Sequence, residues 1–226
     1  MYQNLFLDIK KMKMHVWDDQ KGHLEVPFRK YAYVKDGNGQ HVSLYGDRLK
    51  KVTNYDKDDP TLHESDVPPT TRFLVDNYGD SDEMSVGHRI MFFDIEVEVT
   101  DGFPDVQKAQ NVITSIALYD CITEKYFTYC FDPSKRIESY AKDDEVVEFY
   151  DTEYEMLNKF FQKYLEIRPT IVSGWNSEFF DIPYLYNRAV RVLGPEVANL
   201  LSPISQVLYS EYKKKHTIAG VSSLDY

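Results

Sequence analysis

The pattern of apolar and polar residues changes near residue 85. Residues 1–51 form short alternating segments separated by turn residues, which is typical of β-strands. Residues 54–71 are acidic, contain three prolines and have no periodicity, so they predict a surface connection. The sequence therefore predicts a small β-rich domain at residues 1–85 and a second domain at residues 86–226.

Two shorter elements are predicted inside the first domain. The turn residues Asp36-Gly37-Asn38-Gly39 lie between Tyr31–Val34 and His41–Tyr45, which predicts a β-hairpin. A short element restarts at Phe73–Tyr78, before a second polar break at Gly79–Glu83.

The second domain opens with strands. His88–Val97 is rich in β-branched and aromatic residues, and Val112–Tyr119 and Tyr126–Phe131 predict two further strands. Thr100–Pro104 predicts a turn, and Thr170–Gly174 predicts a short buried strand.

Helices follow the first three strands. A helix is predicted at Thr152–Glu166, because Thr152 and Glu155 form a capping box. Its apolar stripe consists of Leu157, Phe160, Phe161, Tyr164 and Leu165. A second helix with Pro183 in its first turn runs to Val192 or Leu193 and is stopped by Gly194, and a short third helix is predicted at Glu196–Leu201. The order of elements predicts a mixed α/β (α+β) fold.

Composition narrows the class of protein. The chain has 226 residues, and 42% of them are hydrophobic, which is enough for a core. No segment approaches the ~18 consecutive apolar residues of a membrane span, and the amino terminus lacks the pattern of a signal peptide. Cys121 and Cys130 are the only cysteines, which excludes a disulfide scaffold and a multi-cysteine zinc site. A cytosolic location without a targeting signal or membrane partner is predicted.

Charge is spread unevenly. The net charge is −11. Residues 1–51 hold 10 basic and 6 acidic side chains, whereas residues 52–83 hold 2 basic and 9 acidic side chains. A protein that coats nucleic acid by charge alone is basic overall, so that class is disfavoured. An acidic net charge is compatible with an enzyme that binds phosphate through metal ions held by carboxylates.

Two acids occupy one face of a predicted strand. Asp94 and Glu96 are two residues apart in an apolar segment, so both side chains project to the same side. Adjacent carboxylates repel each other, and a bridging divalent cation removes that cost. The alternative is a strand end that exposes two acids to solvent.

A further acid follows the predicted strand that ends at Gly174. Asp181 lies directly before the helix that contains Pro183, so it is either a helix N-cap or a third member of an acidic site. Considered with Asp94 and Glu96, the acidic site is favoured.

These two segments carry a family resemblance. The sequence FFDIEVEVTDGFPD (residues 92–105) resembles the first exonuclease motif of family B DNA polymerases, and VSGWNSEFFDIPYLYNR (residues 172–188) resembles the second. The similarity is strongest to the replicative polymerases of T-even-type tailed phages. It extends over Leu200–Pro203 and reaches Ser223–Tyr226, and looser similarity covers Ser43–Gly46 and Phe73–Asn77.

The resemblance implies a 3′→5′ proofreading exonuclease with a ribonuclease H-like fold. Asp94, Glu96 and Asp181 match the metal-binding and catalytic carboxylates, and Asn176 and Phe180 accompany the second motif. The implied chemistry is a hydrolysis assisted by two Mg²⁺ or Mn²⁺ ions, which releases a nucleoside monophosphate from the primer terminus.

The resemblance also implies DNA contacts outside the carboxylates. Phe103 matches a position beside the frayed primer end, where an aromatic ring stacks on a base; the alternative is that Phe103 anchors its turn to the core. The run Lys213-Lys214-Lys215 lies between Ser205–Tyr212 and His216–Val221, which alternate like hairpin strands. In the family this hairpin helps to separate primer from template; the alternative is a solvated lysine turn.

The resemblance is incomplete at the carboxyl end. The third exonuclease motif and the polymerase motifs of the family are not found, so we expect an incomplete exonuclease domain that works with a downstream polypeptide. The implied partners are a primer-template, a single-stranded 3′ end and, through the downstream portion, a sliding clamp, in the cytoplasm of an infected bacterial host. The alternative function is a non-catalytic nucleic-acid-binding or assembly module of a split polymerase.

Overall fold

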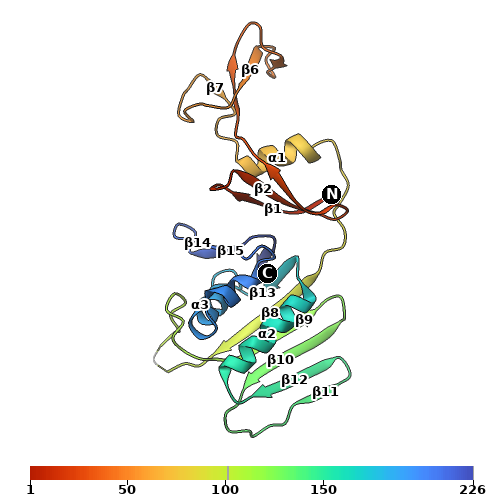
Figure 1. Ribbon diagram of the computed structural model, residues 1–226, viewed down its shortest axis with the longest axis vertical. Coiled ribbons are helices and arrows are strands. Elements are labelled where there is room, and N and C mark those ends of the chain that lie inside the picture. Colours follow the sequence, from red (N-terminus) through yellow and green to blue (C-terminus); the bar gives the residue numbers. More distant parts are fainter. Residues whose placement is uncertain (101, 226) are drawn as a thin grey trace. The chain divides into compact units, whose positions relative to one another are not determined.

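The computed structural model describes residues 1–100 and 102–225 and divides into two compact units, Met1–Val86 and Gly87–Tyr226 (Figure 1). The fold is mixed α/β, as predicted. Asp101 in the predicted turn and Tyr226 at the end of the resembling segment lie outside the described residues. The ribonuclease H-like assignment and the domain roles stay predictions.

The first unit is built from two small antiparallel sheets and one helix. One sheet has the order β1-β2-β3 and consists of β1 (Tyr2–Asp8), β2 (Lys13–Asp18) and β3 (Gly22–Pro27). The other has the order β5-β6-β4-β7 and consists of β4 (Ala32–Lys35), β5 (His41–Val42), β6 (Arg48–Val52) and β7 (Leu62–His63). Helix α1 (Pro69–Tyr78) contributes Phe73 to a small core with Met14, Val16 and Phe28.

The predicted hairpin between Tyr31–Val34 and His41–Tyr45 is wrong. Strand β6 lies between β4 and β5 and pairs with both, so β4 and β5 are not neighbours. The hairpin joins β5 to β6 instead, through a turn in which the Ser43 hydroxyl accepts the N–H groups of Tyr45 and Asp47. Gly46 completes this turn with a φ of +84°, a conformation that suits glycine.

The acidic segment 54–71 is more structured than predicted. It contains β7 and the first turn of α1, where Pro69 fits because its missing N–H is not needed there. The guanidinium of Arg72 is buried and donates to the Glu64 carboxylate at 2.9 Å and to the Glu64 carbonyl at 2.7 Å. This contact holds the segment against the helix.

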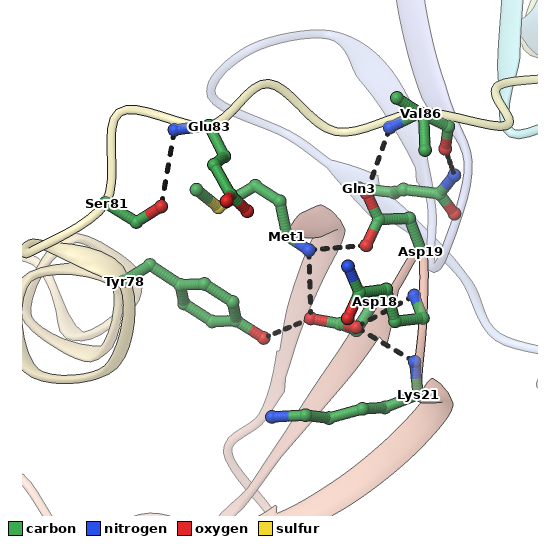
Figure 2. A network of polar contacts seen from close by, with 10 residues as sticks. Met1, Gln3, Asp18, Asp19, Lys21, Tyr78, Ser81, Glu83 and Val86 are labelled. Carbon is green, nitrogen blue, oxygen red and sulfur yellow. Dashed lines mark hydrogen bonds and ion pairs between the residues drawn. The ribbon is translucent and has the colours of Figure 1, made fainter.

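A polar network ties the end of the first unit to its first sheet (Figure 2). The amino group of Met1 pairs with Asp19 and lies 3.6 Å from Asp18. Asp18 also accepts the Tyr78 hydroxyl at 3.0 Å, and Asp19 accepts the Val86 N–H at 3.0 Å. The residues after α1 are therefore fixed to the β-sheet by carboxylates.

The second unit is organised around a seven-stranded mixed sheet of order β11-β12-β10-β9-β8-β13-β16. Its strands are β8 (Ile90–Val97), β9 (Ile113–Asp120), β10 (Lys125–Phe131), β11 (Tyr140–Lys142), β12 (Glu145–Tyr150), β13 (Ile171–Gly174) and β16 (Ser222–Asp225). The predicted hairpin after residue 205 is confirmed as β14 (Val207–Ser210) and β15 (Lys215–Ile218).

Helices cover one side of this sheet. Helix α2 (Glu153–Ile167) packs on β9, β10 and β12, and α3 (Asp181–Val192) packs on β8. A short α4 (Pro195–Ala198) and a 3₁₀ turn (Asn199–Leu201) follow. The core between the sheet and the helices includes Phe93, Ile116, Phe160 and Leu185. Among the described residues, none of the helices combines the length and apolarity needed to span a membrane.

The second unit departs from the prediction in two places. Leu165 was expected in the buried stripe of α2 but is 41% exposed, because Tyr164 and Ile167 turn toward the core and Leu165 lies off that line. Strands β11, β12 and β16 were not predicted. Strand β12 pairs in parallel with β10 and antiparallel with β11, which precedes it through a two-residue turn at Asp143-Asp144.

Candidate functional site

Strand β8 separates apolar from acidic side chains. Met91, Phe93 and Ile95 are buried against the helices, whereas Asp94 and Glu96 are exposed on the opposite face, along with Phe92. This alternation follows from the period of two in a strand. The structure therefore places the two carboxylates on one face near the end of β8.

The neighbouring strand ends earlier than β8 does. Strand β13 runs parallel to β8, pairs Ser173 with Phe92 and stops at Gly174. A Cβ atom at Gly174 would lie 2.5 Å from the Phe93 carbonyl oxygen, so this close approach requires glycine. The chain then turns through residues 175–180 and begins α3 beside the part of β8 that β13 leaves uncovered.

Asp181 connects α3 to that part of β8. It is the first helical residue, is 3% exposed, and its Oδ1 accepts the Ile95 N–H at 3.1 Å. Ile95 lies between Asp94 and Glu96. The N-cap position belongs to Phe180, and no side chain caps the helix there, so the alternative interpretation of Asp181 as an N-cap is wrong.

The environment of Asp181 favours its protonated form. Burial, with a smaller contribution from the negative charges of Asp94 and Asp225, raises the pKa of Asp181 to about 6, although the hydrogen bond from Ile95 acts in the opposite direction. Perturbed carboxyl groups of this kind are concentrated at functional sites.

The carboxylates do not form a closed ligand set. Over residues 1–100 and 102–225, no group of three or more histidine, cysteine, aspartate or glutamate side chains is arranged to hold a metal ion. The chemistry of the donors nevertheless suits a hard cation, since Asp94, Glu96 and Asp181 offer carboxylate oxygens. A cation beside Asp181 would also offset the repulsion from Asp94.

Two aromatic side chains from the predicted DNA contacts lie together. The rings of Phe103 and Phe180 are 5.2 Å apart, and Phe103 is 82% exposed. Phe103 therefore does not anchor its turn in the core. Asn176 is exposed, has a φ of +54°, and accepts the N–H groups of Phe179 and Phe180 at its carbonyl. This turn directs the chain from β13 into α3.

The three lysines of the hairpin differ in their surroundings. Lys213 and Lys214 lie in the exposed turn, where Lys214 is 3.3 Å from Glu211. Lys215 begins β15, and its Nζ lies 2.6 Å from a carboxylate oxygen of Glu178. Lys215 is thus engaged inside the protein, unlike its two neighbours.

Two acidic residues near the site, Asp225 and Glu178, were not singled out from the sequence. Asp225 ends β16, and its Oδ1 accepts the Ser177 hydroxyl and the Glu178 N–H, both at 2.9 Å. Because β16 and β13 are parallel, their carboxyl ends meet at the same end of the sheet. The sequence feature that could have identified Asp225 is an acidic residue at the end of a short strand.

The sequence of the chain is similar to those of known proteins. A sequence profile described as DNA polymerase family B, exonuclease domain, matches residues 79–226. The DNA-directed DNA polymerase of Escherichia phage RB69 is 32% identical over 167 residues, which cover 61% of this chain and 18% of that protein. DNA polymerase 1 of Saccharolobus solfataricus is 32% identical over 145 residues, 58% of this chain and 16% of that protein.

A third relative extends the similarity along the chain. DNA polymerase 1 of Sulfurisphaera ohwakuensis is 27% identical over 212 residues, 82% of this chain and 22% of that protein. The chain thus spans about a fifth of the length of these curated relatives. Because the profile match covers most of the chain, the protein belongs to DNA polymerase family B and carries the exonuclease domain of that family.

Proposed function

We propose that the second unit hydrolyses the terminal phosphodiester at the 3′ end of a DNA strand, as a proofreading exonuclease. The observation that carries this proposal is the hydrogen bond from Ile95 to Asp181, which joins the second acidic segment to the strand between Asp94 and Glu96. Family membership supports the reaction class.

In this proposal Asp94, Glu96 and Asp181 hold two divalent cations, Mg²⁺ or Mn²⁺. Bound cations of this kind activate a water molecule and stabilise the attacking and leaving oxygens of a phosphodiester. The protein contributes fixed positions: Asp94 and Glu96 by the rigid strand β8, and Asp181 by the start of α3 and its bond to Ile95. Ionisation of Asp181 and cation binding favour each other, because its raised pKa reflects burial and nearby negative charge.

The DNA strand is bound by neighbouring side chains. The exposed Phe103 ring, supported by Phe180, provides a stacking surface for a base. Asn176 contributes an exposed amide on the loop before α3. Lys213 and Lys214, in the hairpin turn, contact phosphates of the DNA. Lys215 holds the hairpin to the loop.

The wider activity of a family B polymerase is also a proposal for this chain. The relatives are DNA-directed DNA polymerases of which the chain spans about a fifth. We propose that it works with a downstream polypeptide that carries the third exonuclease motif, the polymerase domains and the clamp contact, in the cytoplasm of an infected bacterium.

Mn²⁺ binding and nuclease assays test the proposal. We expect Asp94→Asn to lower Mn²⁺ affinity, measured by electron paramagnetic resonance, whereas Asp144→Asn, at an exposed turn, leaves it unchanged. The chain alone should release nucleoside monophosphate from a 3′-labelled single strand weakly or not at all. Adding the downstream polypeptide should raise that rate, and Asp94→Asn or Asp181→Asn should then lower it ~100-fold or more.

Two results would contradict it. Full-strength digestion that survives Asp94→Asn would show that the carboxylates are not the catalytic centre. DNA binding without hydrolysis, even with the downstream polypeptide, would favour the alternative of a non-catalytic module.

A further inference from the structure

Glu178 joins three separate segments of the second unit. Its Oε2 accepts the Lys215 ammonium at 2.6 Å, and its Oε1 accepts the Ser223 hydroxyl at 2.6 Å. Its backbone N–H donates to Asp225 at 2.9 Å. One residue therefore connects the loop before α3 with β15 of the hairpin and with strand β16.

This loop is the part of the chain that carries the proposed second motif. It contains Asn176 and Phe180 and leads directly into Asp181. Its main chain is short and tightly turned, with the Ile182 N–H donating to the Ser177 carbonyl at 2.9 Å. A shift of Glu178 must therefore move the neighbouring residues of the motif as well.

Two lysine–glutamate pairs that include a lysine of the hairpin can be compared directly. Lys214 and Glu211 are three residues apart in the turn, and their side chains are 70% and 82% exposed. Lys215 and Glu178 are 37 residues apart, and their side chains are 25% and 16% exposed. Water and salt screen the charges of the first pair strongly and those of the second pair much less. The Lys215–Glu178 pair is therefore the one that links the hairpin to the loop before α3.

We infer that Glu178 is a positioning residue: through Lys215 it fixes the position of the hairpin relative to the loop before α3. This inference rests on the proposed function, because its catalytic consequence requires an exonuclease site at Asp181. With the pair intact, the lysine turn and the motif residues are held as one body. Without it, the hairpin is still packed on α3 through His216 and Tyr186, but the lysine turn loses its direct link to the loop, and the DNA end is bound but poorly aligned.

A charge-exchange series tests the inference in the chain together with the downstream polypeptide. Glu178→Gln and Lys215→Gln should each lower kcat on a short 3′-labelled single strand by ~10-fold while KM changes by less than ~3-fold, because misalignment slows the chemical step more than binding. The double variant Glu178→Lys with Lys215→Glu should recover most of kcat. Glu211→Gln is the matched control and should leave kcat unchanged.

A second measurement does not depend on nuclease activity. Trp175 lies in the same loop and is 71% exposed, and Trp17 is the other tryptophan of the chain. In a Trp17→Phe background, the fluorescence anisotropy of Trp175 should fall in Glu178→Gln and in Lys215→Gln, recover in the exchanged double variant and stay unchanged in Glu211→Gln. Circular dichroism of each variant verifies that it is folded.

The two measurements separate the possible failures. If Trp175 responds as expected but no variant, including the parent chain, shows hydrolysis, the link exists and the proposed nuclease function is wrong. If Glu178→Gln leaves both Trp175 and kcat unchanged, or if the exchanged variant does not recover, Glu178 is not a positioning residue.

Discussion

The two units of the chain are stabilised in different ways. The first has a small core around Met14 and Phe73 and relies on polar and cation–ring contacts; the Arg72 guanidinium lies 4.2 Å from the centre of the Tyr31 ring, and the Lys51 ammonium lies 3.5 Å from it. The second has one large core between a seven-stranded sheet and its helices. The same chain therefore contains one polar-stabilised and one core-stabilised unit.

This difference has a simple physical basis. Small units bury a smaller fraction of their apolar surface, so directed polar contacts supply a larger share of their stability. Truncating an apolar side chain should harm the second unit most, and removing one carboxylate should harm the first. Trp17 and Trp175 lie in different units, so the fluorescence of single-tryptophan variants reports each unfolding transition separately.

The largest effect is expected from Phe160→Ala. Phe160 is fully buried in α2, and its loss should lower the free energy of unfolding of the second unit by about 3–5 kcal/mol through a cavity. Urea unfolding followed by Trp175 measures this, with Leu165→Ala on the exposed side of the same helix as control. An equal shift of the Trp17 transition would mean that the two units unfold together, against the comparison made above.

A gain in stability is expected from Asp181→Asn. The pKa of Asp181 is raised to about 6 in the folded protein from 3.8, so the folded state binds more protons between these values and loses stability as the pH rises through them. Above pH 6 the ionised carboxylate opposes folding. Asn removes that cost, and we expect the second unit to gain roughly 1–3 kcal/mol at pH 8 in metal-free buffer.

The check is the pH dependence of that gain. It should vanish near pH 4, where the native carboxyl is protonated, and shrink when Mn²⁺ is added to the parent protein. A variant less stable than the parent at pH 8 would show that the bond from Ile95 outweighs the burial of the charge.

Sequence patterns predicted the parts of this fold whose determinants are local. The capping residue of α2 is an example: the Thr152 hydroxyl accepts the Glu155 N–H three residues ahead. The pairing of β4 with β6 was missed because the register of β6 depends on contacts on both of its edges. Local turn residues at 36–39 suggested a hairpin that the longer-range pairing overrides.

In the candidate site, too, local sequence patterns did not predict the contacts between distant residues. Motifs identified Asp94, Glu96 and Asp181 as candidates, but the choice between helix cap and site member for Asp181 required its partner Ile95, 86 residues away. The role of Glu178 was not predicted because Lys215 and Ser223 lie 37 and 45 residues further along the chain. Residues that act by joining distant segments leave no periodic signal.

Acid should destabilise the second unit through His216. This side chain is buried between the rings of Tyr186 and Tyr209, and burial lowers its pKa to about 4 from 6.5. The neutral form is favoured in the folded state, so its contribution is complete above pH 6.5 and is lost as the pH falls toward 4. We expect a loss of roughly 1–3 kcal/mol over this range, opposite in sign to the effect of Asp181.

His216→Phe separates the two titrations. The variant keeps an aromatic ring between the two tyrosines but has no proton to bind, so acid should destabilise it less than the parent. Unfolding curves at pH 7, 5.5 and 4.5, followed by Trp175, measure this. An unchanged pH profile would mean that His216 is protonated without leaving its site.

The smallest effect is expected in the polar network of the first unit. The pKa of Asp18 is lowered to about 2, first by the Lys21 N–H and also by the Gln20 N–H, the Tyr78 hydroxyl and the amino terminus. Asp18→Asn keeps the shape of the side chain but removes its charge, and it should lower the free energy of unfolding by about 1–2 kcal/mol at pH 7, because hydrogen bonds to a charged group are weakened.

Since the folded pKa of Asp18 lies below 3.8, this contribution is present above pH 3.8 and is lost as the pH falls through 2. The deficit of the variant, followed by Trp17, should therefore narrow between pH 4 and pH 2, whereas Asp80→Asn, an exposed acid after α1, should match the parent throughout. A deficit that appears in the Trp175 transition instead would place the effect in the wrong unit and contradict the distinction between a polar-stabilised and a core-stabilised half.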